Sequence, residues 1–277
     1  MNNYKNQINK IINFALQEDK INADITSSLA IQKNLKSKVK IVPKADGILF
    51  GVNIVKMILK KIDSKIKIKI LKKDGQKIKK NKAIIVLDGN LKSILKAERT
   101  VLNFLGHLTG ISSETNRLVY LTKKYKTKIC CTRKTIPGLR YLQKEAIRCG
   151  GGKNNRFDLE QEIFVKDNHH VNSKNFKAKI ASIIKMNKNK KVTNVEVDNI
   201  NQLKQVIDLK INRILLDNFS PQALKKALKI IPKKIETEAS GNINSKNIID
   251  YAKTGVNRIS MGYLTHSVKN FDFSLEF

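Results

Sequence analysis

The sequence contains no tryptophan, only three cysteines and no long apolar run, and each absence narrows what the chain can be. Aromatic residues make up 6% of it, so no platform on which nucleic-acid bases could stack is visible. Cys130 and Cys131 are adjacent, which provides neither a disulfide framework nor a CxxC metal pair and favours a reducing, cytoplasmic setting. No apolar run approaches the roughly 18 residues of a membrane span, so we expect a soluble protein.

The N-terminus lacks the continuous apolar core of a signal peptide. Instead, apolar residues recur there at helical spacing, namely Ile8, Ile11, Ile12, Ala15 and Leu16. Glu18 and Asp19 follow them. This pattern predicts a mature amphipathic helix at the start of the chain.

Positive charge is abundant, because 55 lysines and arginines against 23 acidic residues give a formal net charge of +32. Such a chain could gain affinity for nucleic acid by releasing counterions from phosphates. However, only eight of these residues are arginines, and the lysines are spread over the whole length among many isoleucines and asparagines, as A+T-rich coding DNA would produce. Specific nucleic-acid binding is therefore the weaker interpretation, since charge is only its first requirement.

Two sequence styles divide the chain. Over residues 37–88, short strand-like runs alternate with turns, and Ile66, Ile68 and Ile70 show the period-2 alternation of a half-exposed strand. A long helical pattern begins at Lys92. The first part is therefore predicted to be an α+β lobe, followed by a helix that links it to the rest.

Beyond residue 126, β-rich runs such as "NRILLD" and "KIETEAS" alternate with helical segments. Ser220 and Pro221 give the N-cap and first-turn signals of one such helix. Repeated strand–helix units predict a parallel sheet, either an open doubly wound sheet or a barrel.

Polar residues follow each of these predicted strands at its C-terminal end. They are Thr132, Arg133 and Lys134, then Lys166 and Asp167, then Glu196 and Asp198, then Asp217 and Asn218, then Glu238, Ser240 and Gly241, and finally Ser260 and Gly262. In a barrel of parallel strands these ends meet at one mouth, where active sites lie. The opposite ends carry mostly unpatterned lysine and asparagine, so we expect one shared site at the C-terminal mouth.

The residues expected at this mouth carry both signs of charge. The cations are Arg133, Lys134, Arg156 and Lys166, and the carboxylates are Glu196, Asp217 and Glu238. Cations suit an anion, and clustered carboxylates suit an accompanying Mg²⁺ or the hydroxyls of a ribose. Gly241 and Gly262 stand beside serines at strand ends that open into helices, where backbone N–H groups could face a phosphate.

Three consecutive glycines, residues 150–152, follow a helix predicted over residues 138–149. A nucleotide-binding P-loop needs its glycines before a helix and a Ser or Thr after Gly-Lys, whereas Asn154 follows Lys153 here. The glycines are therefore expected to end a helix and turn the chain, which returns Arg156 to the mouth.

A set of motifs resembles one family. They are "ERTVLNFLGHLTGI", "TRKTIPGLRYLQKEAIRCGGG", "KDNH", "VEVDN", "LLDNFSP", "EASGNIN" and "ISMGYLTHS", in this order. Together they look like quinolinate phosphoribosyltransferase, also called nicotinate-nucleotide pyrophosphorylase (carboxylating), and "EDKINADIT" is similar to that family's opening motif. The match covers nearly the whole chain.

This resemblance implies transfer of phosphoribose from phosphoribosyl pyrophosphate to quinolinate with loss of CO₂, which forms nicotinate mononucleotide and pyrophosphate for NAD synthesis. It also implies Mg²⁺ as a cofactor and a homodimer in which Arg99 reaches into the neighbouring subunit's site. The implied fold class is α/β, with an N-terminal α+β sandwich-like lobe over residues 1–108 and an incomplete, open α/β barrel of parallel strands over residues 109–267. A C-terminal tail over residues 268–277 would pack back on the N-terminal lobe.

By the same resemblance, site residues divide between two ligands. Quinolinate would be held by Arg99, Arg133, Lys134, Asn155, Arg156 and Lys166. Phosphoribosyl pyrophosphate would be held by Glu196, Asp217, Ser240, Gly241, Ser260 and Gly262. The implied catalytic residues are Lys134, Lys166, Glu196 and Asp217. Mg²⁺ would be held mainly through pyrophosphate, with Glu196 and Asp217 as its candidate protein ligands.

The chain departs from the family's usual pattern at several positions. Asn155 replaces a histidine expected to touch the substrate, and an amide still donates a hydrogen bond but cannot carry charge. Cys131 replaces an aspartate, Asn242 a glycine and Tyr263 a small residue. The histidines show no metal-like spacing with Asp or Glu, and they are His107, His169, His170 and His266. We expect an active enzyme that could be slower than usual.

Two other functions stay open. A paralogous pyrophosphorylase of the molybdenum-transport type shares the glycine and Thr-Arg-Lys motifs, although the Arg99 segment and "EASG" favour the quinolinate enzyme. A degenerate basic scaffold that binds nucleic acid is the alternative from a different class. Binding to RNA that persists at physiological ionic strength would support it.

Overall fold

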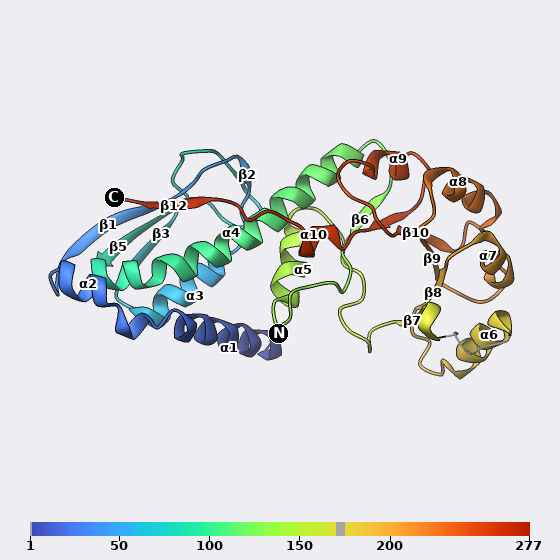
Figure 1. The fold of residues 1–277 in the computed structure, drawn as a ribbon, viewed down its shortest axis with the longest axis horizontal. Coiled ribbons are helices and arrows are strands. Elements are labelled where there is room, and N and C mark those ends of the chain that lie inside the picture. The colour runs from blue at the N-terminus through green and yellow to red at the C-terminus, as the bar shows by residue number, and fades with distance from the viewer. Residues whose placement is uncertain (1, 170–174) are drawn as a thin grey trace. The chain divides into compact units, whose positions relative to one another are not determined.

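The structure is a computed structural model that describes residues 2–169 and 175–277, and the chain forms two compact units (Figure 1). The first unit consists of residues 1–116, 136–151 and 267–277, and the second of residues 117–135 and 152–266. The first unit therefore extends past residue 108 and also takes residues 136–151, which the sequence-based division placed in the barrel. No helix of the described part is long and apolar enough to cross a membrane.

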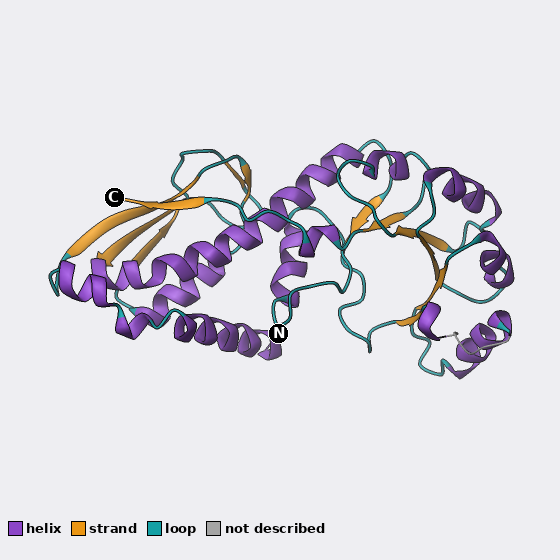
Figure 2. Ribbon diagram, in the orientation of Figure 1, coloured by secondary structure: helices purple, strands orange, loops and turns teal. Residues whose placement is uncertain are grey.

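An antiparallel sheet of four strands, in the order β12, β1, β5, β3, forms the centre of the first unit. These strands are β1 (Lys36–Pro43), β3 (Lys67–Ile70), β5 (Ile85–Asn90) and β12 (Phe273–Glu276), and β2 (Gly47–Ile48) pairs separately with β4 (Lys77–Ile78). The helices are α1 (Asn2–Glu18), α2 (Ile25–Ala30), α3 (Val52–Ile62), α4 (Leu91–Thr122) and α5 (Arg140–Cys149). Figure 2 shows helices α1 to α4 gathered on one side of this sheet. The C-terminal strand β12 pairs antiparallel with β1, so the chain end belongs to this sheet.

Local sequence patterns explain two elements of this unit. The predicted N-terminal helix is α1, and it buries Ile12 and Leu16 completely or nearly so. In β3, Ile68 and Ile70 are half-buried while the lysines between them are exposed, which is the predicted period-2 alternation.

Six parallel strands form the sheet of the second unit, in the order β6, β11, β10, β9, β8, β7. They are β6 (Lys128–Cys130), β7 (Ile163–Val165), β8 (Thr193–Val197), β9 (Arg213–Asp217), β10 (Glu236–Ser240) and β11 (Arg258–Ser260). The helices are α6 (Phe176–Met186), α7 (Ile200–Val206), α8 (Pro221–Ile230), α9 (Ile248–Ala252) and α10 (Tyr263–His266), and a short 3₁₀ helix spans Asp167–His169. Figure 2 shows helices α6 to α9 along the outer side of the curved sheet.

The sheet does not close, because β6 and β7 stand at its two edges and form no ladder with each other within the described ranges. The prediction of an incomplete parallel barrel is therefore confirmed. At the edge beside β6, the backbone of Lys153 donates to Ile129 O over 2.8 Å and accepts from Cys131 N over 3.0 Å. The segment after the three glycines thus runs alongside β6 as a single extra rung.

Charged residues alternate with apolar ones along the central strands. In β9, Ile214 and Leu216 are fully buried on one face, whereas Arg213 begins the opposite face. The N-terminal ends of the strands were expected to carry mostly unpatterned lysine and asparagine, and three central strands depart from this expectation. Arg213, Glu236 and Arg258 stand there and are held in ion pairs, because charges that are withdrawn from water need opposite charges nearby.

The prediction that the three glycines end a helix is confirmed. Helix α5 ends at Cys149, and a Cβ atom on Gly150 would lie only 2.4 Å from Ser112 O in α4. Gly151 then has a φ of +93°, which an L side chain rarely adopts. The glycines therefore permit close packing of α5 on α4 and a turn of the chain. The helix begins at Arg140, two residues later than predicted.

We predict that Gly150→Ala lowers the free energy of unfolding by about 1–3 kcal/mol, because the new methyl group would overpack the contact with α4. Thermal or urea unfolding measures the change. Arg148→Ala is the matched control, since this arginine is exposed on the same helix and pairs with Glu145 at the surface. Equal stability of Gly150→Ala and wild type would contradict the packing role.

Gly241, in the turn after β10, gives a second prediction. It has a φ of +96°, and a Cβ atom would lie 2.2 Å from Asn218 Oδ1 and 2.8 Å from Asn218 N. Gly255 has a similar φ of +85° but nothing within 4 Å of such an atom. Both alanine variants should carry backbone strain of about 1–3 kcal/mol. Only Gly241→Ala should lose further stability through the clash, so equal unfolding temperatures of the two variants would refute this account.

Candidate active site

The C-terminal ends of the parallel strands lie at one edge of the sheet, as the sequence predicted. Ser240 is in register with Asp217 on the neighbouring strand, and Ser260 is in register with Cys130. Glu196 lies opposite Leu215, one step before this edge. Residues from separate parts of the sequence are therefore brought to one mouth by the parallel register.

Lys166 and Glu196 form the closest ion pair of this mouth. Lys166 Nζ lies 2.7 Å from Glu196 Oε2, and the lysine side chain is 43% exposed while the glutamate is nearly buried. A pair with one partly solvated cation can be opened by a ligand that competes for the lysine. Lys166 is therefore available to an anion at the cost of one salt bridge.

Phe164 supports two of the predicted cations. Its ring centroid lies 4.9 Å from Arg156 Cζ and 5.2 Å from Lys166 Nζ, which are cation–π distances. Arg156 is also buried, and its Nη1 donates to Glu162 O over 3.2 Å. Phe164 and Glu162 were not singled out from the sequence, because an aromatic and an acid next to a short strand give no signal on their own.

Arg133 and Arg156 form a region of positive charge. Burial, and then the nearby Arg133 guanidinium, lower the pKa of Arg156 from its ordinary value. Arg133 Nε is buried and has no hydrogen-bond partner within the described part of the chain. A bound anion would stabilise both guanidinium groups, since it would offset the charge repulsion on Arg156 and could accept from the unused buried donor of Arg133.

Asp217 is a half-buried carboxylate among the negatively charged residues of the mouth. Burial raises its pKa above the ordinary value of an aspartate, and Asp198 raises it further, while Lys166, Lys134 and a hydrogen bond from Ser240 lower it. Asn218 Nδ2 donates to Asp217 Oδ2 over 2.7 Å. Asp217 therefore lies within electrostatic reach of two of the predicted cations and of a second carboxylate.

The glycines at the mouth make room for their neighbours. A Cβ atom on Gly262 would lie 2.8 Å from His266 Nε2 and 3.0 Å from Lys134 Cδ. Thr265 Oγ1 donates to Lys134 O over 2.6 Å, which fixes the loop after β6 to the turn after β11. Beside them, Asn218 and Asn242 both have positive φ angles, and Asn242 Nδ2 donates to Asn218 Oδ1. The absence of a side chain at Gly262 thus leaves room for the His266 and Lys134 side chains.

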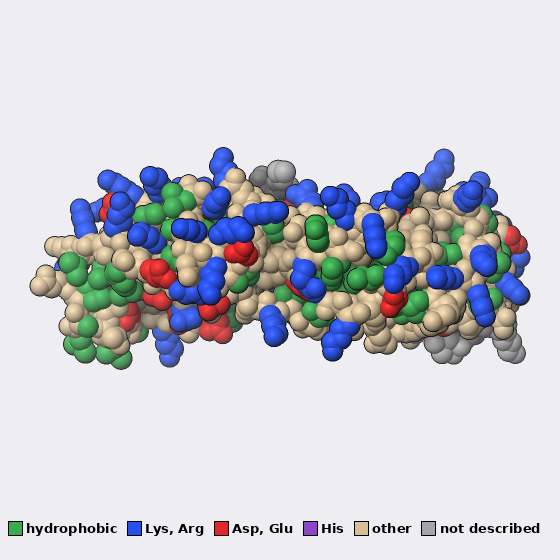
Figure 3. Space-filling view, turned by 90° about the horizontal axis from the view of Figure 1, so that it is seen from above, with side chains coloured by type: hydrophobic (Ala, Val, Ile, Leu, Met, Phe, Trp, Pro, Cys, Tyr) green, Lys and Arg blue, Asp and Glu red, His purple; other side chains and the backbone are tan. Residues whose placement is uncertain are grey.

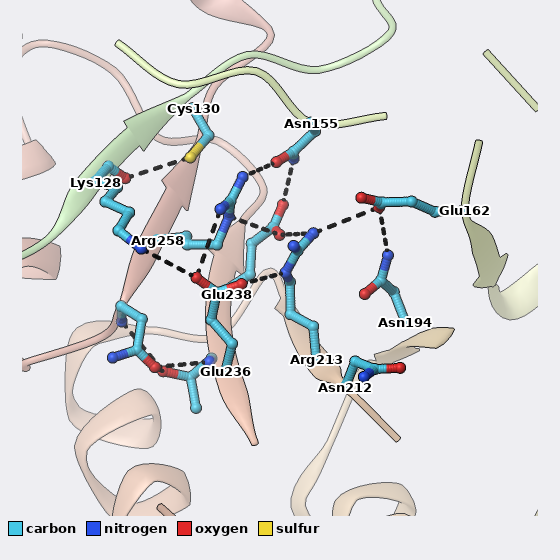
Figure 4. A network of polar contacts seen from close by, with 12 residues as sticks. Lys128, Cys130, Asn155, Glu162, Asn194, Asn212, Arg213, Glu236, Glu238 and Arg258 are labelled. Carbon is cyan, nitrogen blue, oxygen red and sulfur yellow. Dashed lines mark hydrogen bonds and ion pairs between the residues drawn. The ribbon is translucent and has the colours of Figure 1, made fainter. Parts of the chain in front are cut away.

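Three predicted mouth residues, Glu238, Ser260 and Asn155, instead make contacts with one another, and Figure 4 shows the Asn155 and Glu238 side chains pointing toward each other. Glu238 is fully buried, and Ser260 is 3% exposed with its hydroxyl donating to Glu238 Oε1. Asn155 Nδ2 donates to the same Glu238 oxygen over 2.7 Å and to Ser260 Oγ over 2.9 Å.

Histidine and cysteine chemistry finds little support here. Burial raises the pKa of Cys130 to about 12, so its thiol stays protonated at neutral pH. His169 Nδ1 accepts from Lys166 N over 2.9 Å, and His107 in the first unit contacts Gln143 and Asn270. His170 lies outside the described residues. Among the residues described, no group of three or more His, Cys, Asp or Glu side chains is placed to cage a metal ion.

Arg99 belongs to the first unit and is considered there. It lines a cavity of about 450 Å³ together with Glu18, Asp19 and His107. A cationic side chain in a cavity with two carboxylates nearby suits a polar partner. Its predicted role in a neighbouring subunit's site stays a prediction.

The basic surface is diffuse on the face that Figure 3 shows. Lysine and arginine side chains are scattered among other residues there and do not gather into one patch. This distribution agrees with the scattered lysines of the sequence and adds nothing to the nucleic-acid interpretation.

Comparison with known proteins matches both parts of the chain to one family. Residues 24–109 match the family model described as quinolinate phosphoribosyl transferase, N-terminal domain, and residues 111–276 match the one described as its C-terminal domain. A probable nicotinate-nucleotide pyrophosphorylase [carboxylating] of Bacillus subtilis (strain 168) is 36% identical over 98% of this chain and 93% of its own length. The protein of the same description from Methanocaldococcus jannaschii is 38% identical over 96% of each chain.

Solved structures agree with the sequence matches. The nicotinate-nucleotide pyrophosphorylase from Francisella tularensis superposes with a TM-score of 0.92 at 39% identity, over 98% of this chain and 96% of that one. The chain belongs to the quinolinate phosphoribosyl transferase family.

Proposed function

We propose that this protein transfers phosphoribose from phosphoribosyl pyrophosphate to quinolinate with loss of CO₂, which yields nicotinate mononucleotide and pyrophosphate for NAD synthesis. Family membership supports this reaction, as do relatives named as carboxylating nicotinate-nucleotide pyrophosphorylases. The single observation that carries it is the mouth itself. There Arg156 and Lys166 lie over the same Phe164 ring, and Lys166 forms an ion pair with Glu196.

Quinolinate is a dicarboxylate, and the cations of the mouth match it. Arg133, Lys134, Arg156 and Lys166 would hold its two carboxylates, each charge-assisted contact contributing about 1.5–3 kcal/mol. Phe164 keeps Arg156 and Lys166 on one support. Asn155 was placed in this set by resemblance, but its amide bonds to Glu238 and Ser260 suggest an indirect role.

Phosphoribosyl pyrophosphate would lie toward β8 to β11. As pyrophosphate leaves, the ribose ring gains positive charge, which Glu196 and Asp217 can stabilise without forming a covalent bond. Gly241 and Gly262, just after β10 and β11, would present backbone N–H groups to the 5′-phosphate, with Ser240 and Ser260 beside them at the strand ends. Lys134 and Lys166 would bind the negative charge of the leaving pyrophosphate and the carboxylates of quinolinate. Catalysis is then a matter of placement and electrostatics.

Mg²⁺ fits this donor set as a substrate-borne ion. Asp198 is close enough to Asp217 to raise its pKa, so two carboxylates lie near each other. Mg²⁺ is usually bound by one or two carboxylates together with substrate phosphates. Glu196 and Asp217 are the proposed protein ligands. When bound, the ion would neutralise charge on the pyrophosphate leaving group.

Decarboxylation needs a leaving carboxylate that is shielded from water and a pyridinium ring whose charge is tolerated. The cations proposed for quinolinate would orient the ring and exclude water from it. A nucleophilic cysteine is not required. We further propose a cytoplasmic homodimer in which Arg99 of one subunit completes the other subunit's quinolinate site.

The first test measures quinolinate-dependent release of CO₂ and pyrophosphate with Mg²⁺ present. Wild type should be active, and Arg133→Ala should lose about 10- to 100-fold in kcat/KM because one or two charge-assisted contacts to quinolinate are removed. Arg148→Ala removes an equal charge at the surface and should match wild type. A folded wild type that is silent in this assay would refute the proposed reaction and favour a paralogous pyrophosphorylase.

Asp217→Asn should separate stability from activity. Because folding raises the pKa of Asp217, its carboxylate destabilises the folded protein once it ionises, so the amide should raise the melting temperature at pH 7. Below about pH 4 the carboxylate is protonated in both states and the gain should vanish. The same variant should lose at least about 100-fold in kcat/KM.

Asp208→Asn is the control of opposite sign. Its carboxylate is exposed, and a hydrogen bond from Lys177 lowers its pKa, so the substitution should not raise the melting temperature at pH 7. If both variants shift the melting temperature alike, the claim that the ionised Asp217 carboxylate destabilises the folded protein is wrong.

A further inference from the structure

Asn155 is carried by a segment that joins the sheet at its open edge. Lys153 forms the rung with β6, and Asn155 follows two residues later, immediately before Arg156. Figure 4 shows the Asn155 side chain directed at Glu238 and Arg258 in the barrel interior. The segment thus has one side chain anchored inside the barrel and the next one among the cations of the mouth.

The Asn155 amide uses all its donor and acceptor types in this anchor. Its two Nδ2 hydrogens go to Glu238 Oε1 and to Ser260 Oγ, over 2.7 Å and 2.9 Å. Its Oδ1 accepts from Arg258 Nη2 over 2.5 Å. Both hydrogens are therefore committed within the protein, which leaves no N–H for a substrate carboxylate.

Only an amide satisfies these three neighbours together. They require two hydrogens on one atom and an acceptor on the other, in a small planar group. A neutral imidazole offers one donor and one acceptor, and a protonated one would present a second cation to Arg258 without any acceptor. An aspartate would offer acceptors only and would face the Glu238 carboxylate. The identity of residue 155 is thus tied to the identity of residue 258.

The charge balance around Glu238 strengthens this link. Glu238 is fully buried, and its Oε2 lies 3.4 Å from Arg213 Nη1 and 3.6 Å from Arg258 Nε. Arg213 and Arg258 also share Glu236, at 2.8 Å and 3.5 Å. Glu162 lies 3.7 Å from Arg213, and Lys128 lies 3.5 Å from Glu236. Three cations therefore already balance three carboxylates in this cluster, so a further cation at position 155 would be unpaired, whereas it could replace Arg258 if that arginine were absent.

We infer that Asn155 is a positioning residue matched to Arg258: it anchors segment 153–156 to the buried ion cluster and so holds Arg156 at the mouth. This inference rests on the proposed function, because Arg156 is there assigned to a quinolinate carboxylate. Asn155 acts through Arg156 and does not touch the substrate. Its replacement affects the binding of quinolinate and leaves that of phosphoribosyl pyrophosphate nearly unchanged.

A double-mutant cycle tests the match, with Asn155→His, Arg258→Met and both together. Asn155→His should raise KM for quinolinate about tenfold or more, with KM for phosphoribosyl pyrophosphate within about twofold. In the Arg258→Met background the same substitution should cost at least about fivefold less, because the imidazole then faces no guanidinium and can donate to Glu238. Asn201→His, on an exposed position of α7, is the control and should change neither KM.

Melting temperatures of the ligand-free variants make the cycle independent of turnover. Coupled losses support the match between the two residues, and additive losses overturn it. An equal rise of both KM values would overturn the positioning role and leave a structural one. If the wild type shows no turnover but the losses in melting temperature across the cycle are coupled, the proposed function is refuted and the match between Asn155 and Arg258 stands. If Asn155→His does not fold alone, folding of the double variant with Arg258→Met supports the match. If the double variant does not fold either, the same cycle is measured with Asn155→Ser in place of Asn155→His, and coupled or additive losses then decide as above.

Discussion

Paired charge buried inside a parallel sheet is the constraint on which the second unit depends. Glu238 has no contact with water, and the Arg213 and Arg258 side chains are only 9% exposed. Withdrawing each such ion from water costs several kcal/mol, so the strands must keep the register that places opposite charges together. The mouth inherits this register, because Asp217 and Ser240 lie four and two residues farther along the same faces of β9 and β10. The interior cluster is thus the base on which the proposed site is built.

The mouth itself concentrates unfavourable contacts between like charges. Arg133 opposes the charge of Arg156, and Asp198 opposes that of Asp217. Groups held in this way make the protein less stable than it could be, and a pair of anionic ligands with an accompanying cation would remove both conflicts. Binding sites that are strained without their ligands are common, since affinity grows when a ligand relieves the strain.

Much of this arrangement could be predicted from the sequence, and the part that could not has a physical reason. The convergence of strand ends follows from parallel topology alone, and the Ser220 cap is a local signal that the structure confirms through its bond to Ala223 N. Arg213 and Arg258 were not recognised, because a charge at the start of a strand looks the same whether it meets water or a distant partner. Glu238 was expected at the mouth and instead lies in the interior, because it stands two residues before the end of β10, in register with Arg258. Helix α5 joins the first unit through Gly150, a contact between segments that no local pattern encodes. The roles given to the site residues remain predictions.

The gap between β6 and β7 has a consequence for how such an enzyme can change over time. In a hydrogen-bonded strand, side chains alternate between the two faces of the sheet. A single inserted residue therefore moves every following side chain to the opposite face, and only a shift of two residues keeps them on the same face. Beyond its one rung, segment 153–156 is held by contacts of Asn154, Asn155 and Arg156 and not by a ladder, so it is free of that restriction. Insertions or exchanges there can alter the reach of Arg156 by small amounts without disturbing the six strands. Substrate preference can therefore drift at the open edge while the rest of the sheet stays fixed.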